Sequence, residues 1–291
     1  MANNVLSYND IKPFEFYSSL LTVTDIPITN NFSVHIPTVG QVLSNEQEYL
    51  ALASTLVASP MSYMIQLDEM GYKLWDKMTD YELFTILFKK YVIQLNLLEK
   101  NAEIQIPPDI RDSLMRSRDI FSLIFGETDI VHFSFIEENT ADDTESDPSI
   151  LMPKKGFFYN SVTKAIINEN IYNKMADTIR KINLFEHKKG RPANENSKRY
   201  LFDKEVRRQK RLKNKKPQPY FEPLVVALVN NVGFKYDYEG VENLSLYKFN
   251  QSYRQIAHDI QFQNINRGIY AGTIDSSKLT DKSILSWVLT K

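Results

Sequence analysis

The clearest helix signal in the chain lies at residues 79–98, TDYELFTILFKKYVIQLNLL. Thr79 and Glu82 have the spacing of a capping box, in which the two residues exchange hydrogen bonds between side chain and backbone. Apolar residues then recur at helical spacing from Leu83 to Leu98. The stretch therefore predicts an amphipathic helix of about five turns.

The segments around this helix also have helical patterns. Residues 45–58 carry apolar side chains at helical spacing, with Asn45 as the expected cap. Ser59-Pro60 predicts a second start, because proline fits the first position of a helix, and Gly71 predicts its end. Two more helices are expected at residues 111–125 and at residues 161–184, the latter capped by Ser161.

The expected β content is small. Residues 1–44 hold short alternating runs broken by prolines, which predicts a mixture of strands and extended chain. Residues 130–136 and 154–159 flank residues 137–147, which carry six acids in eleven residues. We predict that the flanks pair as a hairpin with a solvated acidic tip. Metal binding by these carboxylates is less favoured, because the segment lacks the glycine and the ligand spacing of a calcium loop.

Positive charge is concentrated in one segment of the chain. Residues 188–216 hold thirteen of the 35 Lys and Arg but only three of the 36 Asp and Glu, in a chain of formal net charge −1. Such segregation supplies long-range attraction and suggests a docking surface. The candidate residues of this surface are Lys188, Lys189, Arg191, Arg199, Arg207, Arg208, Lys210, Arg211 and Lys213.

The C-terminal part of the chain is again helical in pattern. Residues 224–232 are apolar nearly all round, which predicts a buried helix ended by Gly233. A longer helix is expected at residues 244–260, and a short one at residues 282–288 with Trp287 as its packing anchor. The sequence therefore predicts a small C-terminal helical module.

Together these patterns predict a mainly α fold with a minor β component (α+β). The expected parts are a mixed N-terminal region at residues 1–44, a helical body at 45–187, a basic connector at 188–219 and a C-terminal module at 220–291. With 43% hydrophobic residues, the chain is able to bury a sizeable core.

Several classes of function are disfavoured by composition and motifs. The chain has no cysteine, no signal-peptide pattern and no apolar run near the ~20 residues of a membrane helix, so we expect an intracellular protein without a membrane partner. His35, His132, His187 and His258 are far apart in sequence, and structural or surface roles are expected for them. Known catalytic and nucleotide-binding motifs are missing, which predicts no cofactor and no enzymatic activity; a triad assembled in space stays open.

The basic segment leaves several partners open. Gly190-Arg191-Pro192 resembles the core of an AT-hook, although a flexible basic loop is the favoured interpretation. A helix within residues 197–215 would be basic on most faces. It could bind nucleic acid, an acidic protein surface or residues 137–147 of its own chain, or it could simply be solvated.

Three stretches of sequence and one tryptophan resemble a known class of proteins. HIPTVGQVL (residues 35–43), LSLYKF (244–249) and GIYAGTID (268–275), with Trp287, resemble tail-morphogenesis proteins of tailed phages that infect Gram-positive bacteria, of the kind described as tail assembly chaperones. The positions that carry the resemblance are His35, Pro37, Gly40, Phe249, Gly268, Tyr270, Gly272 and Trp287.

The resemblance implies a non-enzymatic protein that acts in the host cytoplasm. Such chaperones coat the helical tape-measure protein and recruit tail-tube subunits, and an apolar helical surface could shield tape-measure helices. Residues 83–98 and 224–229 are the candidate surfaces, although ordinary core is the favoured role for both. Two alternative functions stay open: a structural tail or connector component, and a nucleic-acid-binding phage protein using residues 188–216. The oligomeric state is also open.

Overall fold

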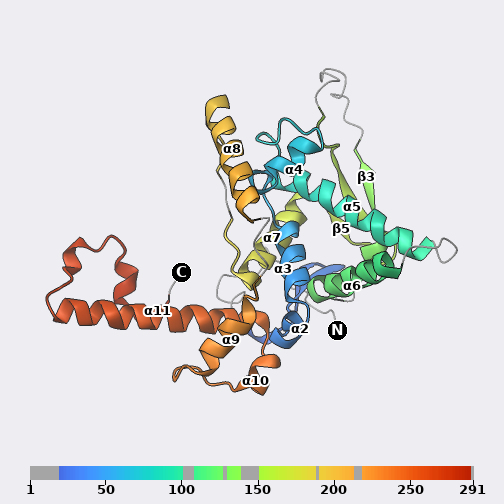
Figure 1. Ribbon diagram of the computed structural model, residues 1–291. Helices are drawn as coiled ribbons and strands as arrows, with labels where there is room; N and C mark the ends of the chain where they lie inside the picture. The colour runs from blue at the N-terminus through green and yellow to red at the C-terminus, as the bar shows by residue number, and fades with distance from the viewer. Residues whose placement is uncertain are drawn as a thin grey trace. The chain divides into compact units, whose positions relative to one another are not determined.

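The computed structural model describes residues 20–100, 108–126, 130–138, 151–187, 190–212 and 218–289 of the 291-residue chain (Figure 1). The predicted fold class is confirmed: the protein is mainly helical, with two small antiparallel sheets. The chain forms two compact units. Unit 1 comprises residues 1–36 and 45–218, and unit 2 comprises residues 37–44 and 219–291. The four-part division made from the sequence stays a prediction.

Unit 1 combines helices with both sheets. Its elements are β1 (Asp25–Thr29), β2 (Phe32–His35), α3 (Glu46–Leu56), η1 (Pro60–Ser62), α4 (Met64–Glu69), α5 (Asp80–Lys100), α6 (Pro108–Phe125), η2 (Ile130–His132), β3 (Phe133–Glu137), β4 (Gly156–Asn160), β5 (Ile166–Ile167), α7 (Glu169–Asn183) and α8 (Glu195–Leu212).

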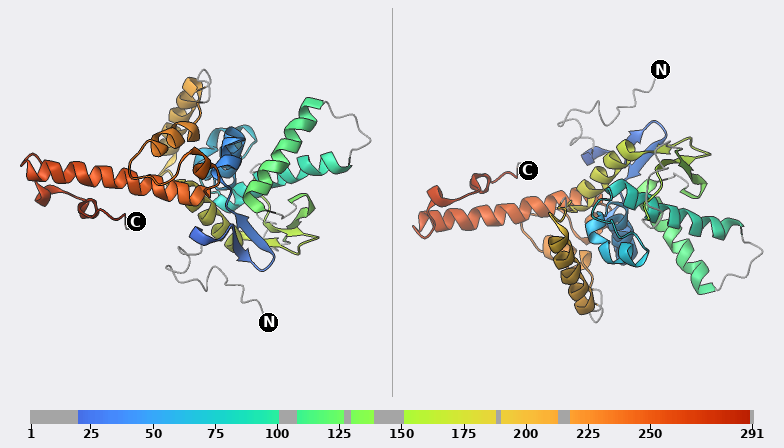
Figure 2. Two further views of the ribbon diagram at one scale, coloured as in Figure 1. Left: turned by 90° about the horizontal axis from the view of Figure 1, so that it is seen from below. Right: turned by 90° about the horizontal axis from the view of Figure 1, so that it is seen from above.

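The capping box at the start of α5 is confirmed. The Thr79 amide donates to Glu82 Oε2 at 2.7 Å, and the Glu82 amide donates to Thr79 Oγ1 at 3.1 Å. The following turns carry Phe84 and Phe88, whose rings stack with their centroids 4.9 Å apart in the centre of the core. Figure 2 shows α5 and α6 meeting at this core and diverging away from it.

The predicted hairpin is also confirmed. β3 and β4 pair antiparallel from Phe133 opposite Asn160 to Glu137 opposite Gly156. The Tyr81 hydroxyl, on α5, donates to the carbonyls of Gly156 and Ile167 and so ties the helix to β4 and β5. Most of the acidic tip, residues 139–147, lies outside the described residues.

The predicted helix at residues 161–184 is wrong in its first third. The Asn160 side chain accepts hydrogen bonds from the amides of Val162 and Thr163, which fixes a turn. Ile166–Ile167 then pair with β4 as the strand β5. Helix α7 begins at Glu169, and its cap is Asn168 rather than Ser161. The helix is therefore capped by a side chain closer to the apolar repeat than Ser161 is.

The starts of two other helices differ from the sequence-based prediction. Asn45 precedes α3 but makes no side-chain capping hydrogen bond. The segment after Ser59 forms the short 3-10 turn η1 before α4, instead of one continuous helix. Gly71, with a φ of +94°, lies just beyond α4 as predicted, in the left-handed backbone region that glycine tolerates.

Unit 2 is assembled from two distant parts of the sequence. Its elements are α2 (Val39–Leu43), α9 (Phe221–Val229), α10 (Tyr238–Glu242), α11 (Leu246–Tyr270), η3 (Ser276–Lys278) and η4 (Lys282–Leu285). The prediction of strand or extended chain is wrong for residues 39–43, because Thr38 and Gln41 form a capping box that starts α2. The Pro37 carbonyl accepts from the Leu246 amide at 2.8 Å, and the Val39 amide donates to the Leu244 carbonyl at 2.9 Å.

The C-terminal helices differ from the predicted ones in length and burial. α9 ends at Val229, and Val226 and Val232 are exposed, so residues 224–232 do not form a helix buried on all sides. α11 runs ten residues beyond the predicted end, so Gly268 lies within it, while Gly272 has a φ of +72° in the turn that follows. Trp287 is 64% exposed and is no packing anchor. Among the described residues, no helix is both long and apolar enough to cross a membrane.

Candidate interaction site

The basic segment contains a regular helix, α8. The Asn194 side chain caps it by accepting from the Ser197 amide at 2.9 Å. Lys210 and Arg211 occupy its last turn, where positive charge interacts favourably with the helix dipole. None of its residues is buried. α8 is therefore held by one side only, and its other sides face solvent.

Lys198 anchors α8 to unit 1. Its ammonium lies 2.5 Å from Asp76 Oδ1, donates to the Lys73 carbonyl at 3.0 Å and sits 5.3 Å from the centroid of the Trp75 ring. The side chains of Lys198 and Asp76 are only 15% and 17% exposed. One turn further along, Phe202 packs against the buried cluster of Met64, Leu67, Trp75, Met78 and Leu83.

A groove of about 350 Å³ lies between α8 and the η1–α4 segment. We call it the α4–α8 groove, and its lining residues are Met61, Ser62, Met64, Gly190, Leu201, Lys204, Glu205, Arg208 and Arg211. Methionine and leucine side chains supply apolar surface, and three cations from α8 line the same space. An amphipathic segment with acidic residues along one edge would complement this combination.

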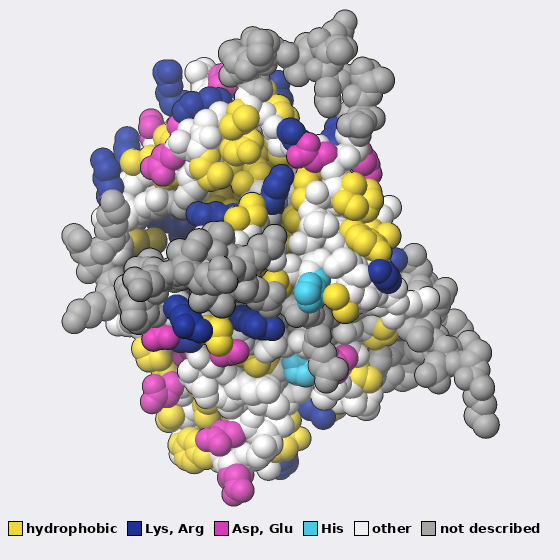
Figure 3. Space-filling model, turned by 90° about the vertical axis from the view of Figure 1, so that its right-hand side faces the viewer, with side chains coloured by type: hydrophobic (Ala, Val, Ile, Leu, Met, Phe, Trp, Pro, Cys, Tyr) yellow, Lys and Arg dark blue, Asp and Glu magenta, His cyan; other side chains and the backbone are white. Residues whose placement is uncertain are grey.

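The cations of α8 differ in their pairing. Arg208 forms two hydrogen bonds of 2.8 Å with Glu205, and these bonds raise the pKa of the guanidinium above its ordinary value. Within the described part of the chain, Arg207, Lys210 and Arg211 have no carboxylate partner. The face of the molecule in Figure 3, in contrast, intersperses Lys and Arg with Asp and Glu. Helix α8 itself carries seven Lys and Arg against three Asp and Glu.

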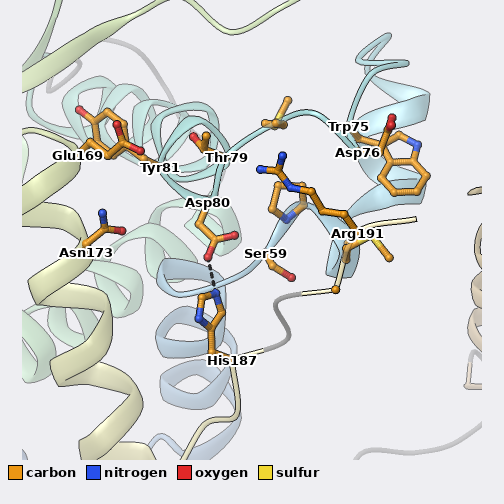
Figure 4. A pocket seen from close by; sticks show the side chains of 14 residues that line it. Ser59, Trp75, Asp76, Thr79, Asp80, Tyr81, Glu169, Asn173, His187 and Arg191 are labelled. Carbon is orange, nitrogen blue, oxygen red and sulfur yellow. Dashed lines mark hydrogen bonds and ion pairs between the residues drawn. The ribbon is translucent and has the colours of Figure 1, made fainter. Parts of the chain in front are cut away.

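A second pocket, of about 240 Å³, lies where α5 and α7 begin (Figure 4). Asp80 accepts from His187 Nε2 at 2.7 Å and lies 3.4 Å from Arg180 Nη2. Arg180 is almost fully buried and also donates to the Val57 carbonyl at 2.9 Å. Figure 4 shows Asp80 and His187 pointing toward each other and Arg191 extending into the pocket from another side.

The contacts of this pocket are those of a structural clasp. The hydroxyl of Ser59, which lines the pocket, pairs with the Ser62 hydroxyl at 3.3 Å. Burial raises the pKa of the Tyr172 phenol, and the nearby Asp80 carboxylate raises it further. In the described ranges, no three His, Asp or Glu side chains gather into a potential metal site. Asp80 therefore holds the segment that leads from α7 toward α8.

The structure brings together part of the predicted basic surface. Arg199, Arg207, Arg208, Lys210 and Arg211 lie on α8, whereas Arg191 precedes it and lines the Asp80 pocket. Lys188, Lys189 and Lys213 are outside the described residues. Of the five on α8, only Arg208 and Arg211 line the α4–α8 groove.

The positions that carry the phage resemblance are divided between the units. His35 is in unit 1, with Nδ1 2.9 Å from Asp25 Oδ1. In unit 2, a Cβ on Gly40 would lie 3.1 Å from the Glu242 carbonyl oxygen, and Phe249 is completely buried. Gly268, Tyr270, Gly272 and Trp287 all belong to the end of α11 and the segment after it.

Sequence reasoning missed the residues that build the groove and the clasp. Met61, Met64 and Leu201 carried no signal of their own, because their role in the groove depends on how α8 packs. Asp80 and His187 are 107 positions apart, so no local spacing could reveal their contact. One signal was available: Lys198 and Phe202 lie one turn apart on a polar helix, so both lie on the face of α8 that packs against unit 1.

These features define a helical protein with a cationic exposed helix and a groove beside it. Residues 213–288 match the family described as YomV second domain, a phage-derived family name that suggests a phage protein. The match includes α9, α10, α11 and the segment after α11. Neither the curated proteins nor the solved structures gave a match to the chain.

Proposed function

We propose that this chain is a non-enzymatic phage protein that acts in tail assembly in the host cytoplasm. It would serve as a chaperone that binds the tape-measure protein, tail-tube subunits or both. The phage-derived family name and the resemblance of residues 35–43 and 268–275 to tail-morphogenesis proteins support the phage setting. The observation that carries the binding role is the α4–α8 groove, with its apolar lining and cationic α8 side.

The groove suits a helical segment of a partner. Methionine side chains adapt to different apolar surfaces, and Met61 and Met64 both line it. Lys204 and Arg211 would attract acidic residues at the edge of the incoming helix, which favours one orientation. A long helical protein such as a tape measure presents many such segments in succession.

The test is co-expression of the full chain with the tape-measure protein of its own phage. The chain should raise the soluble fraction of the tape-measure protein and co-purify with it. The double variant Lys204→Glu/Arg211→Glu should lose this effect, because it reverses two charges in the groove. The matched control Arg199→Glu/Lys210→Glu reverses two α8 charges outside the groove and should retain it. No effect of the wild-type chain, or equal loss in both variants, would contradict the groove as the binding site.

The cations distributed around α8 favour nucleic acid as a second candidate partner. Binding to phosphates would weaken steeply as salt rises, and both double variants would weaken it alike. A gel-shift titration of the full chain across salt concentrations therefore separates this candidate from groove binding. Detection of the chain in purified phage particles would instead favour a structural virion component.

A further inference from the structure

The distal half of α11 extends beyond the buried core of unit 2. Leu246 and Phe249, at its start, are buried in the core of unit 2 together with residues from α2, α9 and α10. Residues 251–289, all of them described, contain no buried side chain, although many are apolar. The buried part of unit 2 therefore ends in the second turn of α11.

One face of α11 continues the apolar stripe past this core. Leu246, Phe249, Tyr253, Ile256 and Ile260 follow one another at alternating spacings of three and four residues. This is the repeat that makes helices pair along a seam. The first two are buried and the last is 48% exposed. The same spacing continues through Gln263 and Arg267 to Tyr270, which is 91% exposed.

The chain after α11 covers the opposite face of the helix. A turn at Gly272 reverses the direction, and Ile274 lies so close to Gly268 that an added Cβ would be 2.5 Å from its Cδ1 atom. The returning segment is fixed by hydrogen bonds of Gln255 Nε2 to the Trp287 carbonyl and of His258 Nε2 to the Ser286 carbonyl, both 2.7 Å. Figure 2 shows this segment running back beside α11. The stripe through Ile260 and Tyr270 is left open, because it lies on the other side of the helix.

The charges of this region suit a second copy of the same region. Residues 251–289 carry four Lys and Arg and three Asp and Glu, so two copies do not repel each other strongly. Asp259 is bonded only to Gln263, at 2.8 Å, and Arg267 has no ion pair among the described residues. Two α11 helices aligned antiparallel about Gln263 would bring each Asp259 beside the Arg267 of the other copy. The same alignment places each Tyr270 beside the Ile256 of the other copy.

We propose that the outer face of α11, formed by Ile256, Ile260, Gln263, Arg267 and Tyr270, is a self-association surface that pairs antiparallel with a second copy of this chain. The interface is small, so the dimer is weak and depends on concentration. This surface is separate from the α4–α8 groove, and the inference does not depend on the proposed function.

The first test measures the mass of the full chain by analytical ultracentrifugation over about 1 to 100 µM. The wild type should shift from monomer toward dimer as the concentration rises. Ile260→Asp and the reversal Arg267→Asp should each weaken association at least tenfold, whereas Asp259→Arg combined with Arg267→Asp should restore it. Val232→Ser, at an exposed apolar position of unit 2 away from the stripe, should leave it unchanged. A wild-type chain that stays monomeric, or a double variant no better than the single one, would overturn the proposal.

The second test uses the absence of cysteine from the chain. Residue 263 lies at the proposed symmetry axis, so mild oxidation of the variant Gln263→Cys should link two copies through a disulfide. The variant Ala257→Cys, at an exposed position, is the control. Its counterpart in the other copy would lie about 18 Å away along the helix, too far for a disulfide. Linking at residue 257 but not at residue 263 would overturn the antiparallel pairing.

Discussion

Units 1 and 2 differ in how they use their apolar residues. Unit 1 buries a continuous aromatic cluster, in which Phe84 and Phe88 of α5 both contact Phe158 of β4, and Phe84 also contacts Tyr172 of α7. Unit 2 buries only the residues around α2, α9, α10 and the start of α11, and leaves the distal half of α11 without a core. Unit 1 thus supports α8 on a packed core, whereas the distal half of α11 lies outside the buried core of unit 2.

The largest difference should appear when an aromatic residue of unit 1 is removed. Phe84→Ala leaves a cavity among four contacting rings and should lower the free energy of unfolding of unit 1 by about 4 kcal/mol. Urea denaturation followed by Trp75 fluorescence in a Trp287→Phe background reports on unit 1, because Trp75 is buried there. Ile93→Ala, at an exposed position of the same helix, is the control and should change stability by less than about 0.5 kcal/mol.

Removing a core residue of unit 2 should destabilise unit 2 without destabilising unit 1. Phe249→Ala removes the buried ring that packs near Phe221, and should destabilise unit 2 by about 3 kcal/mol. Hydrogen exchange should become faster in α9, α10 and the start of α11, while the urea midpoint of Trp75 fluorescence stays unchanged. A midpoint that falls as far as it does for Phe84→Ala would show that the units unfold as one, contrary to the comparison.

The clasp at Asp80 should have an intermediate effect within unit 1. Arg180→Ala leaves Asp80 without one of its two side-chain partners and the Val57 carbonyl without its donor, which should cost about 2 kcal/mol. Lys90→Ala, at an exposed position of α5, is the control. Equal midpoints for Arg180→Ala and wild type in urea denaturation would rule out a stabilising clasp.

The smallest expected change concerns the attachment of α8. Lys198→Met removes the contact with Asp76 and should destabilise unit 1 by about 1 kcal/mol, while amide exchange in α8 becomes markedly faster. Arg199→Met, at the adjacent exposed position, should change neither. Unchanged exchange in α8 for Lys198→Met would mean that Phe202 packing alone holds the helix.

Local signals predicted the parts of the fold that local chemistry controls. The capping box at Thr79 and the strands on either side of the acidic tip were readable, because residues within a few positions of each other determine them. The contribution of residues 37–44 to unit 2 was not readable, since it depends on contacts such as that between Pro37 and Leu246, which lie far apart in sequence. The Thr38 and Gln41 capping box was the signal for α2 that sequence reasoning overlooked.

Of the candidate site, the sequence predicted the positive charge but not the groove. The concentration of Lys and Arg indicated a cationic surface, and α8 carries five of the nine named residues. The apolar lining of the groove depends on the packing of α8 against η1 and α4, which no periodicity within residues 188–216 specifies. The open face of α11 was missed because the helix was expected to end near residue 260.

Hydrogen exchange of the full chain at two protein concentrations tests most directly the claim that unit 1 is stable alone whereas the distal half of α11 is stabilised by association. Amides of α5 around Phe84 and Phe88 should exchange slowly and equally at both concentrations. Amides of residues 256–270 should exchange rapidly in dilute protein and more slowly at high concentration, where copies associate. Exchange of residues 256–270 as slow as that of α5 at both concentrations would contradict the account.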